Sequence, residues 1–208
     1  MATTRKEEIL LATLDLASER GLKAVTLSQI AERVGIRKPS LYNHFGSKDQ
    51  ILQDAYQLLR DRARDRAELR VSQVDPGMDE SLEQVLLRSF EQYGSFVLDD
   101  EVLRFFRVLY SERSTSPVAA QIMVDETNRM VQQVKALFYG LAAHGRLQVD
   151  DVDMAAMSFA CTVHTLVDLQ MDMLTAGEAL ASDGNVPVFD EVREYVAWFA
   201  RQMEPRHE

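Results

Sequence analysis

TLSQIAERVGIRKPSLYNHF, residues 26–45, is the stretch that decides the predicted fold. Its first half carries the start and stop signals of a short helix over residues 27–34. Thr26 and Gln29 form a capping box, in which the Thr hydroxyl accepts from a backbone N–H of the first turn and the Gln side chain reaches back. Gly35 ends the helix, because glycine tolerates the left-handed conformation that closes many helices.

A second short helix is expected over residues 38–45, after a three-residue turn at 35–37. Pro39 fits its first turn, where a missing N–H costs nothing. Leu41 and Phe45 are four residues apart, so both face the core. Two helices joined in this way form a helix-turn-helix, whose second helix enters the major groove of DNA. The same pattern also occurs in enzymes. The side chains left outside are Lys38, Ser40, Tyr42, Asn43 and His44.

Helical periodicity continues on both sides of this segment. A helix over residues 4–20 is expected to end at Gly21, and a second capping box, Ser47 with Gln50, opens a long helix. No alternating strand pattern is present, so the predicted fold is all-α: an N-terminal three-helix helix-turn-helix domain followed by a helical bundle. Further helices are expected over residues 81–98, 101–112, 117–144, 152–175 and 188–203, with a loop at 177–187.

Charge is distributed unevenly along the chain, whose net charge is -10. Residues 1–50 hold eight basic and six acidic side chains, whereas the rest holds 15 basic and 27 acidic ones. Lys and Arg supply most non-specific affinity for DNA by neutralising phosphates. The asymmetry is therefore that of a chain in which only the N-terminal segment contacts DNA.

The sequence favours a cytoplasmic protein that does not insert into a membrane. Residues 1–8 lack the apolar run of a signal peptide, and no uninterrupted apolar stretch reaches the roughly 18 residues of a membrane span. Cys161 is the single cysteine, which excludes an intrachain disulfide and a cysteine-based zinc cage.

Residues 9–52 resemble the DNA-binding domain of the tetracycline-repressor (TetR) family. The resemblance implies a symmetric dimer that binds double-stranded DNA at a palindromic operator, and a C-terminal domain that senses a ligand. The predicted division is therefore a DNA-binding domain at 1–47 and a ligand-sensing and dimerisation domain at 48–208. The matching positions are Ile9-Leu10, Ala12, Gly21, Val25-Thr26-Leu27, Ile30-Ala31, Val34-Gly35-Ile36, residues 40–45, Ser47-Lys48 and Ile51-Leu52.

The resemblance also implies roles for individual residues. This sequence departs from many members at Arg37, Pro39 and Asn43, so the operator sequence is not carried over. The residues that would hold phosphates are Thr26, Ser28, Tyr42, His44 and Lys48. Those that would approach bases are Arg37, Lys38, Ser40 and Asn43.

The remaining sequence contains two sets of apolar residues with a predicted function. Phe, Tyr and Met side chains of the C-terminal part suit either a helical core or a pocket for a small apolar or aromatic effector. The last two predicted helices, over residues 152–175 and 188–203, are expected to form the dimer interface as a four-helix bundle, because the last one carries an apolar stripe too large to leave in water. The predicted pocket residues are Phe90, Phe106, Tyr110, Met123, Met130 and Phe138. The predicted interface residues are Val192, Tyr195, Val196, Phe199 and Met203.

Competing functions have weaker support in the sequence. No nucleophile, base and orienting group occur together, so no catalytic residue is assigned, and no cofactor is expected. Cys161, His164 and Asp168 share one helical face and could present metal ligands, but an apolar helix is better explained as buried, and no metal site is assigned. The resemblance instead implies a transcriptional regulator, expected to be a repressor that a small molecule releases from its operator. Constitutive DNA binding, or control by a protein partner, is the alternative.

Overall fold

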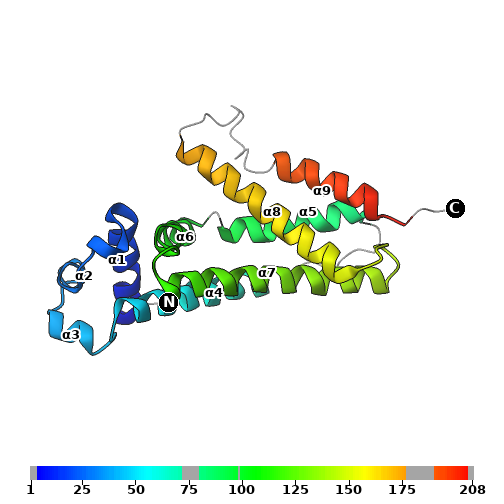
Figure 1. The fold of residues 1–208 in the computed structure, drawn as a ribbon. Helices are drawn as coiled ribbons and strands as arrows, with labels where there is room; N and C mark the ends of the chain where they lie inside the picture. Colours follow the sequence, from blue (N-terminus) through cyan, green and yellow to red (C-terminus); the bar gives the residue numbers. More distant parts are fainter. Residues whose placement is uncertain (1–3, 72–79, 98, 177–189, 206–208) are drawn as a thin grey trace. The chain divides into compact units, whose positions relative to one another are not determined.

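The computed structural model describes residues 4–71, 80–97, 99–176 and 190–205. Within these ranges the chain is entirely helical, which confirms the all-α prediction (Figure 1). The elements are α1 Arg5–Arg20, the 3-10 helix η1 Leu22–Ala24, α2 Leu27–Val34, α3 Lys38–Tyr42, α4 Lys48–Val71, α5 Leu82–Val97, α6 Asp100–Glu112, α7 Pro117–Ala143, α8 Val152–Thr175 and α9 Asp190–Met203.

Two local features differ from the sequence prediction. The α3 helix ends at Tyr42 instead of residue 45, because His44 N and Phe45 N both donate to the Leu41 carbonyl, at 3.0 and 3.1 Å, in a closing turn. The η1 helix was not predicted; it follows Gly21, whose φ of 77° suits glycine. The predicted loop at 177–187 and the predicted helix start at 188 lie outside the described residues.

The chain forms two compact units. One comprises residues 1–75 with 92–125, and the other comprises residues 76–91 with 126–208. The first unit therefore includes α6 and the start of α7 as well as the helix-turn-helix. The predicted boundary after residue 47 lies inside the first compact unit, and the division of functions at that residue stays a prediction.

The core of the first unit forms around α1, which packs against α2, α4 and α6. Leu41 and Phe45 fix α3 to this core, being 0% and 2% exposed. Apolar burial of this extent is the main favourable term in folding, at about 25 cal/mol per Å². The core includes Ile9, Leu14, Leu22, Val25, Ile30, Ile51, Leu52, Tyr56, Val102, Phe105 and Leu109.

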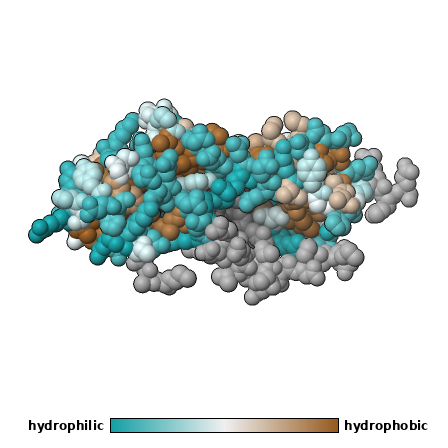
Figure 2. Space-filling model, turned by 90° about the horizontal axis from the view of Figure 1, so that it is seen from below, coloured by the Kyte–Doolittle hydropathy of each residue, from teal (hydrophilic) through white to brown (hydrophobic). Residues whose placement is uncertain are grey.

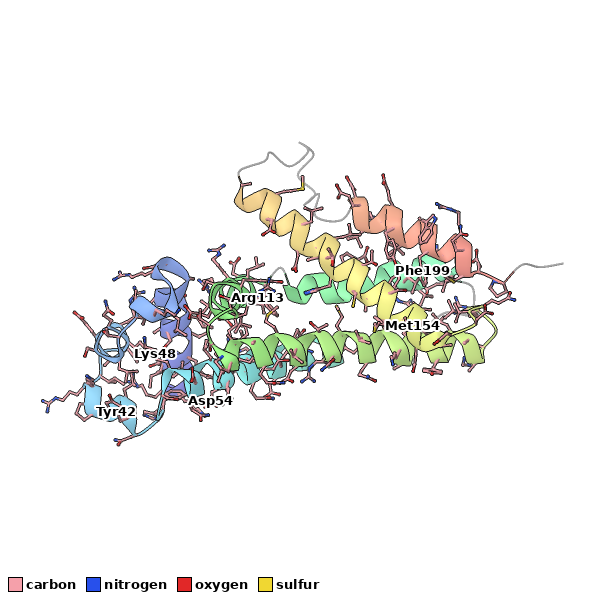
Figure 3. The ribbon with its side chains drawn as sticks, viewed as in Figure 1. Tyr42, Lys48, Asp54, Arg113, Met154 and Phe199 are labelled. Atoms are coloured by element: carbon pink, nitrogen blue, oxygen red, sulfur yellow. The ribbon has the colours of Figure 1, made fainter. Side chains whose placement is uncertain are left out.

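The second unit is organised by aromatic rings where α8 packs against α9. The Phe159 ring lies 5.5 Å from that of Phe138 and 4.9 Å from that of Phe199, centroid to centroid. Figure 3 labels Phe199 on α9. Gln148 N also donates to the Met203 carbonyl at 2.8 Å, which ties the end of α9 to the segment before α8.

We predict that Phe199→Ala lowers the free energy of unfolding by about 3 to 5 kcal/mol, because it leaves a cavity among packed rings. Arg193→Ala, at an exposed position of the same helix, serves as the control and is expected to change stability by less than about 0.5 kcal/mol. Urea denaturation followed by circular dichroism measures both. Equal losses in the two variants would contradict the assignment of Phe199 to the core.

Candidate nucleic-acid interface

The predicted capping box of α2 is confirmed. Gln29 N donates to the Thr26 hydroxyl at 3.2 Å, and the Gln29 side-chain oxygen accepts from Thr26 N at 2.8 Å. The helix ends at Gly35, whose φ of 70° is left-handed, and Ile36 N then donates to the Ala31 carbonyl at 2.9 Å. These bonds set the turn that directs the chain into α3.

The α3 helix exposes nearly all of its side chains. Leu41 is its one buried residue, and Pro39 lies in the first turn. Ser40 N donates to the Arg37 carbonyl at 2.9 Å, so Arg37 starts the helix through its backbone while its side chain makes no capping bond. Tyr42 is 51% exposed, a high value for a ring. The exposed predicted contacts on this segment are Arg37, Lys38, Ser40, Tyr42, Asn43 and His44.

Lys48 begins α4 and is half-buried (Figure 3). Its Nζ donates to the Leu22 carbonyl at 2.9 Å. A lysine ammonium has three donors, so two remain for an anion. Of the second predicted capping box, the structure shows the bond from Gln50 N to the Ser47 hydroxyl, at 3.1 Å; the Gln50 side chain donates instead to Asp54, at 2.7 Å, so the prediction was half wrong.

The remaining predicted contacts on α2 are Thr26 and Ser28, both exposed. The Thr26 hydroxyl also donates to the Gln29 side-chain oxygen at 2.9 Å. A phosphate that accepted a hydrogen bond from Thr26 would therefore replace Gln29 as the acceptor. Ser28 lies in the first turn of the same helix, next to the positive end of its dipole, where an anion is favoured.

Lys6 contacts the recognition segment, residues 37–45, on its buried side. Its Nζ lies 2.6 Å from an Asp54 carboxylate oxygen and 5.5 Å from the centre of the buried Phe45 ring. Lys6 is thus engaged within the protein. By contrast, Arg37 and Lys38 form no ion pair with any residue that the structure describes, so their positive charges face solvent. Both of these cations lie on the segment that the sequence assigned to DNA.

Comparison with known families agrees with this geometry. A profile described as bacterial regulatory proteins, tetR family, matches residues 9–55. A second profile, AefR-like transcriptional repressor, C-terminal domain, matches residues 84–201, which is more than half of the chain. This chain belongs to the tetR family. The tetR family consists of transcriptional regulators and not enzymes. The predicted family and the prediction of a regulator instead of an enzyme are therefore both confirmed.

Individual tetR-family relatives are distant. The regulator BetI of Agrobacterium fabrum is 26% identical over 196 residues, covering 86% of this chain and 93% of BetI. The repressor KstR2 of Mycolicibacterium smegmatis is 41% identical over 58 residues, 28% of this chain, so the match spans about a quarter (27%) of KstR2.

Solved structures share the fold. A TetR family regulator of Pseudomonas syringae pv. tomato superposes with a TM-score of 0.70 at 22% identity, over 100% of both chains. A regulator of Saccharomonospora viridis, in complex with choline, gives 0.68 at 20% identity, over 97% of this chain and 98% of the other.

The predicted effector residues fall into the two compact units. Phe106, Tyr110 and Met123 belong to the first unit, where the rings of Phe106 and Tyr110 are half-buried and 6.5 Å apart. Phe90, Met130 and Phe138 belong to the second unit and are buried. Phe138 packs on Phe159 and Phe199, as a core residue does. Their assignment to a pocket stays a prediction.

The predicted dimer stripe is mostly buried within one protomer, and its role in a dimer stays a prediction. Val192 and Val196 are fully buried and Phe199 is 2% exposed within a single protomer, so these side chains belong to its core. Tyr195 and Met203 are half-buried. Helical periodicity identified the apolar face of α9 correctly, but α8 of the same chain already covers part of that face. Among the described side chains of α8 and α9, the large apolar ones that reach the surface are Met154, Met157, Leu169 and Trp198, each between 45% and 54% exposed.

The contact between α8 and α9 also positions Tyr195. Burial raises the pKa of the Tyr195 hydroxyl, because the phenolate is disfavoured in an apolar setting, and a hydrogen bond with Thr162 opposes the shift. The Tyr195 ring stacks on Trp198 with centroids 5.9 Å apart. Tyr195 therefore holds the exposed indole in place from the core side.

The candidate metal ligands on α8 gain no support as a metal site. In the described part of the chain, no three His, Cys, Asp or Glu side chains lie close enough to hold a metal ion; His164 Nε2 is 3.7 Å from Asp168, and Cys161 is exposed.

Among the described residues, one stretch, Val152–Leu169, is long and apolar enough to cross a membrane. The core helix of a globular protein can have the same length and composition. The buried face of this stretch, which includes Phe159, Val163 and Val167, packs inside the second unit.

Sequence reasoning missed two features. The first is a hydrogen bond of 2.9 Å from Lys23 Nζ to the Thr115 hydroxyl, which joins residues 92 positions apart. No periodic pattern encodes such a contact. The second is the burial of two acids, Glu112 and Glu126, at 6% and 3% exposure. The sequence could have indicated this burial, since each glutamate lies on the apolar face of its helix.

We predict that Thr26→Ala lowers the free energy of unfolding by about 1 kcal/mol, the usual effect of losing an N-terminal cap. Thr26→Ser keeps the hydroxyl and should retain most of the stability. Ser28→Ala, two residues along, is the matched control with no expected loss. Thermal unfolding of the three variants tests the assignment, and a Thr26→Ala protein as stable as the parent would refute it.

Proposed function

We propose that this chain is a cytoplasmic repressor that binds a palindromic operator as a homodimer and leaves it when a small molecule binds. The observation that carries the proposal is the exposed recognition segment. Leu41, which attaches this segment to the core, is fully buried. Arg37 and Lys38 are exposed and form no ion pair with any residue that the structure describes. A short helix presenting cations and amides in this way suits the edges of bases in the major groove.

The two kinds of DNA contact differ in position. Arg37, Lys38, Ser40 and Asn43 lie on the recognition segment and suit base edges, since Lys and Arg pair with guanine and Asn with adenine. Lys48 lies beyond it, at the first turn of α4, where the helix dipole also favours a phosphate. Thr26, Ser28, Tyr42 and His44 complete the proposed phosphate contacts.

A homodimer is supported by the exposed strip on α8. Met154, Met157, Cys161, Thr165 and Leu169 are all exposed and uncharged, at spacings of three or four residues along one helical face. Trp198 on α9 adds a 50% exposed indole. Figure 2 shows that hydrophobic residues also reach the surface among hydrophilic ones on the face drawn there, which is ordinary. A continuous uncharged strip along one helix is less ordinary and suits a second copy of the chain.

Release by a small molecule is supported by relatives. One structural neighbour is described as a flavonoid-responsive regulator and another was solved with choline, and each name concerns that protein. For this chain we propose a mainly apolar effector, recognised by aromatic and Met side chains. An effector shifts the equilibrium only if it binds the two conformations with different affinity. Repression is preferred because the C-terminal profile is that of a repressor.

We predict that Lys48→Ala weakens binding to all duplexes about equally and flattens the salt dependence by about one charge per protomer. Asn43→Ala and Lys38→Ala should instead relax preference at particular base pairs, by about 1 to 3 kcal/mol where a bidentate contact is lost. Binding to a randomised duplex library at several salt concentrations measures both effects. The optimum selected by the parent protein should be an inverted repeat.

The reverse pattern would refute these roles. It would consist of a Lys48→Ala protein with altered base preference and an unchanged salt slope, or of a non-palindromic optimum. A library from which the parent protein selects nothing would refute DNA recognition altogether. Thermal unfolding of each variant controls for loss of structure, because Lys48 also bonds to Leu22.

We predict that Met157→Glu with Trp198→Glu produces monomers, because both side chains are exposed in the protomer and a buried charge is costly in an interface. Arg193→Glu, at an exposed position on another face of α9, is the control and should stay dimeric. Light scattering and circular dichroism together measure mass and folding. A folded double variant with the mass of a dimer would contradict the proposed interface.

A further inference from the structure

We propose that Lys23 and Thr115 are positioning residues for DNA binding, through which the turn between α6 and α7 holds the phosphate-binding ammonium of Lys48 in place. The inference rests on the proposed function and adds a regulatory connection to it. Neither residue is assigned a contact with DNA.

The first step is the bond that orients Lys48. Its Nζ lies 2.9 Å from the Leu22 carbonyl oxygen, which also accepts from Val25 N at 3.2 Å. A free lysine side chain samples many rotamers, and ordering it on binding costs free energy. The Leu22 carbonyl removes part of that cost in advance while leaving two donors of the ammonium available. The position of η1 therefore sets where the Lys48 charge lies.

The second step is the bond that holds η1. Lys23 follows Leu22 directly, and its Nζ lies 2.9 Å from the Thr115 hydroxyl. Thr115 is itself fixed in the turn after α6, since its N–H and its hydroxyl both donate to the Glu112 carbonyl, at 2.9 and 3.3 Å. The Lys23 ammonium is thus directed towards this turn. A hydrogen bond with a charged donor is stronger than a neutral one.

The third step is what these bonds connect. Lys23 and Lys48 lie in the segment matched by the N-terminal profile, residues 9–55, and Thr115 lies in the C-terminal match, residues 84–201. All three belong to one compact unit. Displacement of the α6–α7 turn would pull on Lys23, move the Leu22 carbonyl and take Lys48 out of its phosphate-binding position. A second link between the same segments, Arg104 to Asp15 at 3.3 Å, bypasses η1 and so provides a comparison.

The test is a set of double-mutant cycles on DNA affinity. The probe is a fluorescent duplex selected by the parent protein from a random library. Thr115→Val removes the acceptor without changing charge, and it should weaken binding about three- to tenfold. Lys23→Met should have a similar effect, and the two changes together should be no worse than either alone. Thr115→Ser keeps the hydroxyl acceptor and should bind with the affinity of the parent protein. Ser114→Ala, in the same turn, is the neutral control.

The decisive background is Lys48→Met. If Thr115 acts through Lys48, Thr115→Val should have no further effect there, whereas Arg104→Gln should have the same effect in both backgrounds. Amide hydrogen exchange at Val25 should also be faster in Thr115→Val than in Thr115→Ser, because the η1 turn is less restrained. Thermal unfolding confirms that each variant is folded.

Contrary outcomes separate this inference from the proposed function. An undiminished effect of Thr115→Val in the Lys48→Met background would overturn it, as would an inert Thr115→Val protein. If Lys23→Met weakens binding while Thr115→Val does not, Lys23 contacts phosphate directly and the positioning role is wrong. A parent protein that selects no duplex would instead refute the proposed function itself.

Discussion

The helix-turn-helix depends on a hydrophobic core that it does not complete by itself. In the first compact unit, α1 packs against α2 and α4 on the DNA-binding side and also against α6. Phe105 of α6, at 1% exposure, stacks on Tyr56 of α4 with ring centroids 6.1 Å apart. Removing α6 from this core would expose apolar surface that the small N-terminal domain has no means to cover. The helix-turn-helix and α6, which lies in the C-terminal profile match, therefore share one compact unit.

This shared core explains how such a short recognition helix is held. An isolated five-residue helix is far below the length that is stable in water. Here Leu41 and Phe45 insert into the core on either side of the closing turn, and Lys6 covers the Phe45 ring. With its buried side fixed, the opposite side presents polar groups at low entropic cost. Gly35 is essential to the arrangement, since its left-handed φ of 70° sets the angle between α2 and α3.

Local sequence signals predicted the parts of the fold that local forces determine. The Thr26 capping box, the stop at Gly35 and the burial of Leu41 depend on residues at most four positions apart, so periodicity and cap chemistry were sufficient. Contacts between distant segments were not predictable in this way. Val196 and Phe199 were recognised as apolar, but their packing inside the protomer was not predicted, because a hydrophobic stripe does not identify its partner. Lys23 and Thr115, 92 residues apart, left no signal at all.

The uneven distribution of charge along the chain determines which part of its surface can attract DNA. Residues after position 50 carry 12 more acidic than basic side chains, so the far field of the protein repels a polyanion. At physiological ionic strength charges are screened beyond roughly 8 Å. The acidic surplus is then felt weakly at the recognition segment, whereas the proposed DNA contacts Arg37, Lys38 and Lys48 would act at short range. Attraction would thereby be confined to one surface. In the proposed dimer, two copies of that surface would square the selectivity of a single copy, since free energies of separate contacts add. The phosphate contact proposed for Lys48 can form on any duplex, so it adds affinity without selectivity. Discrimination between sequences then depends on the base contacts proposed for the recognition segment, because only a matching site satisfies them.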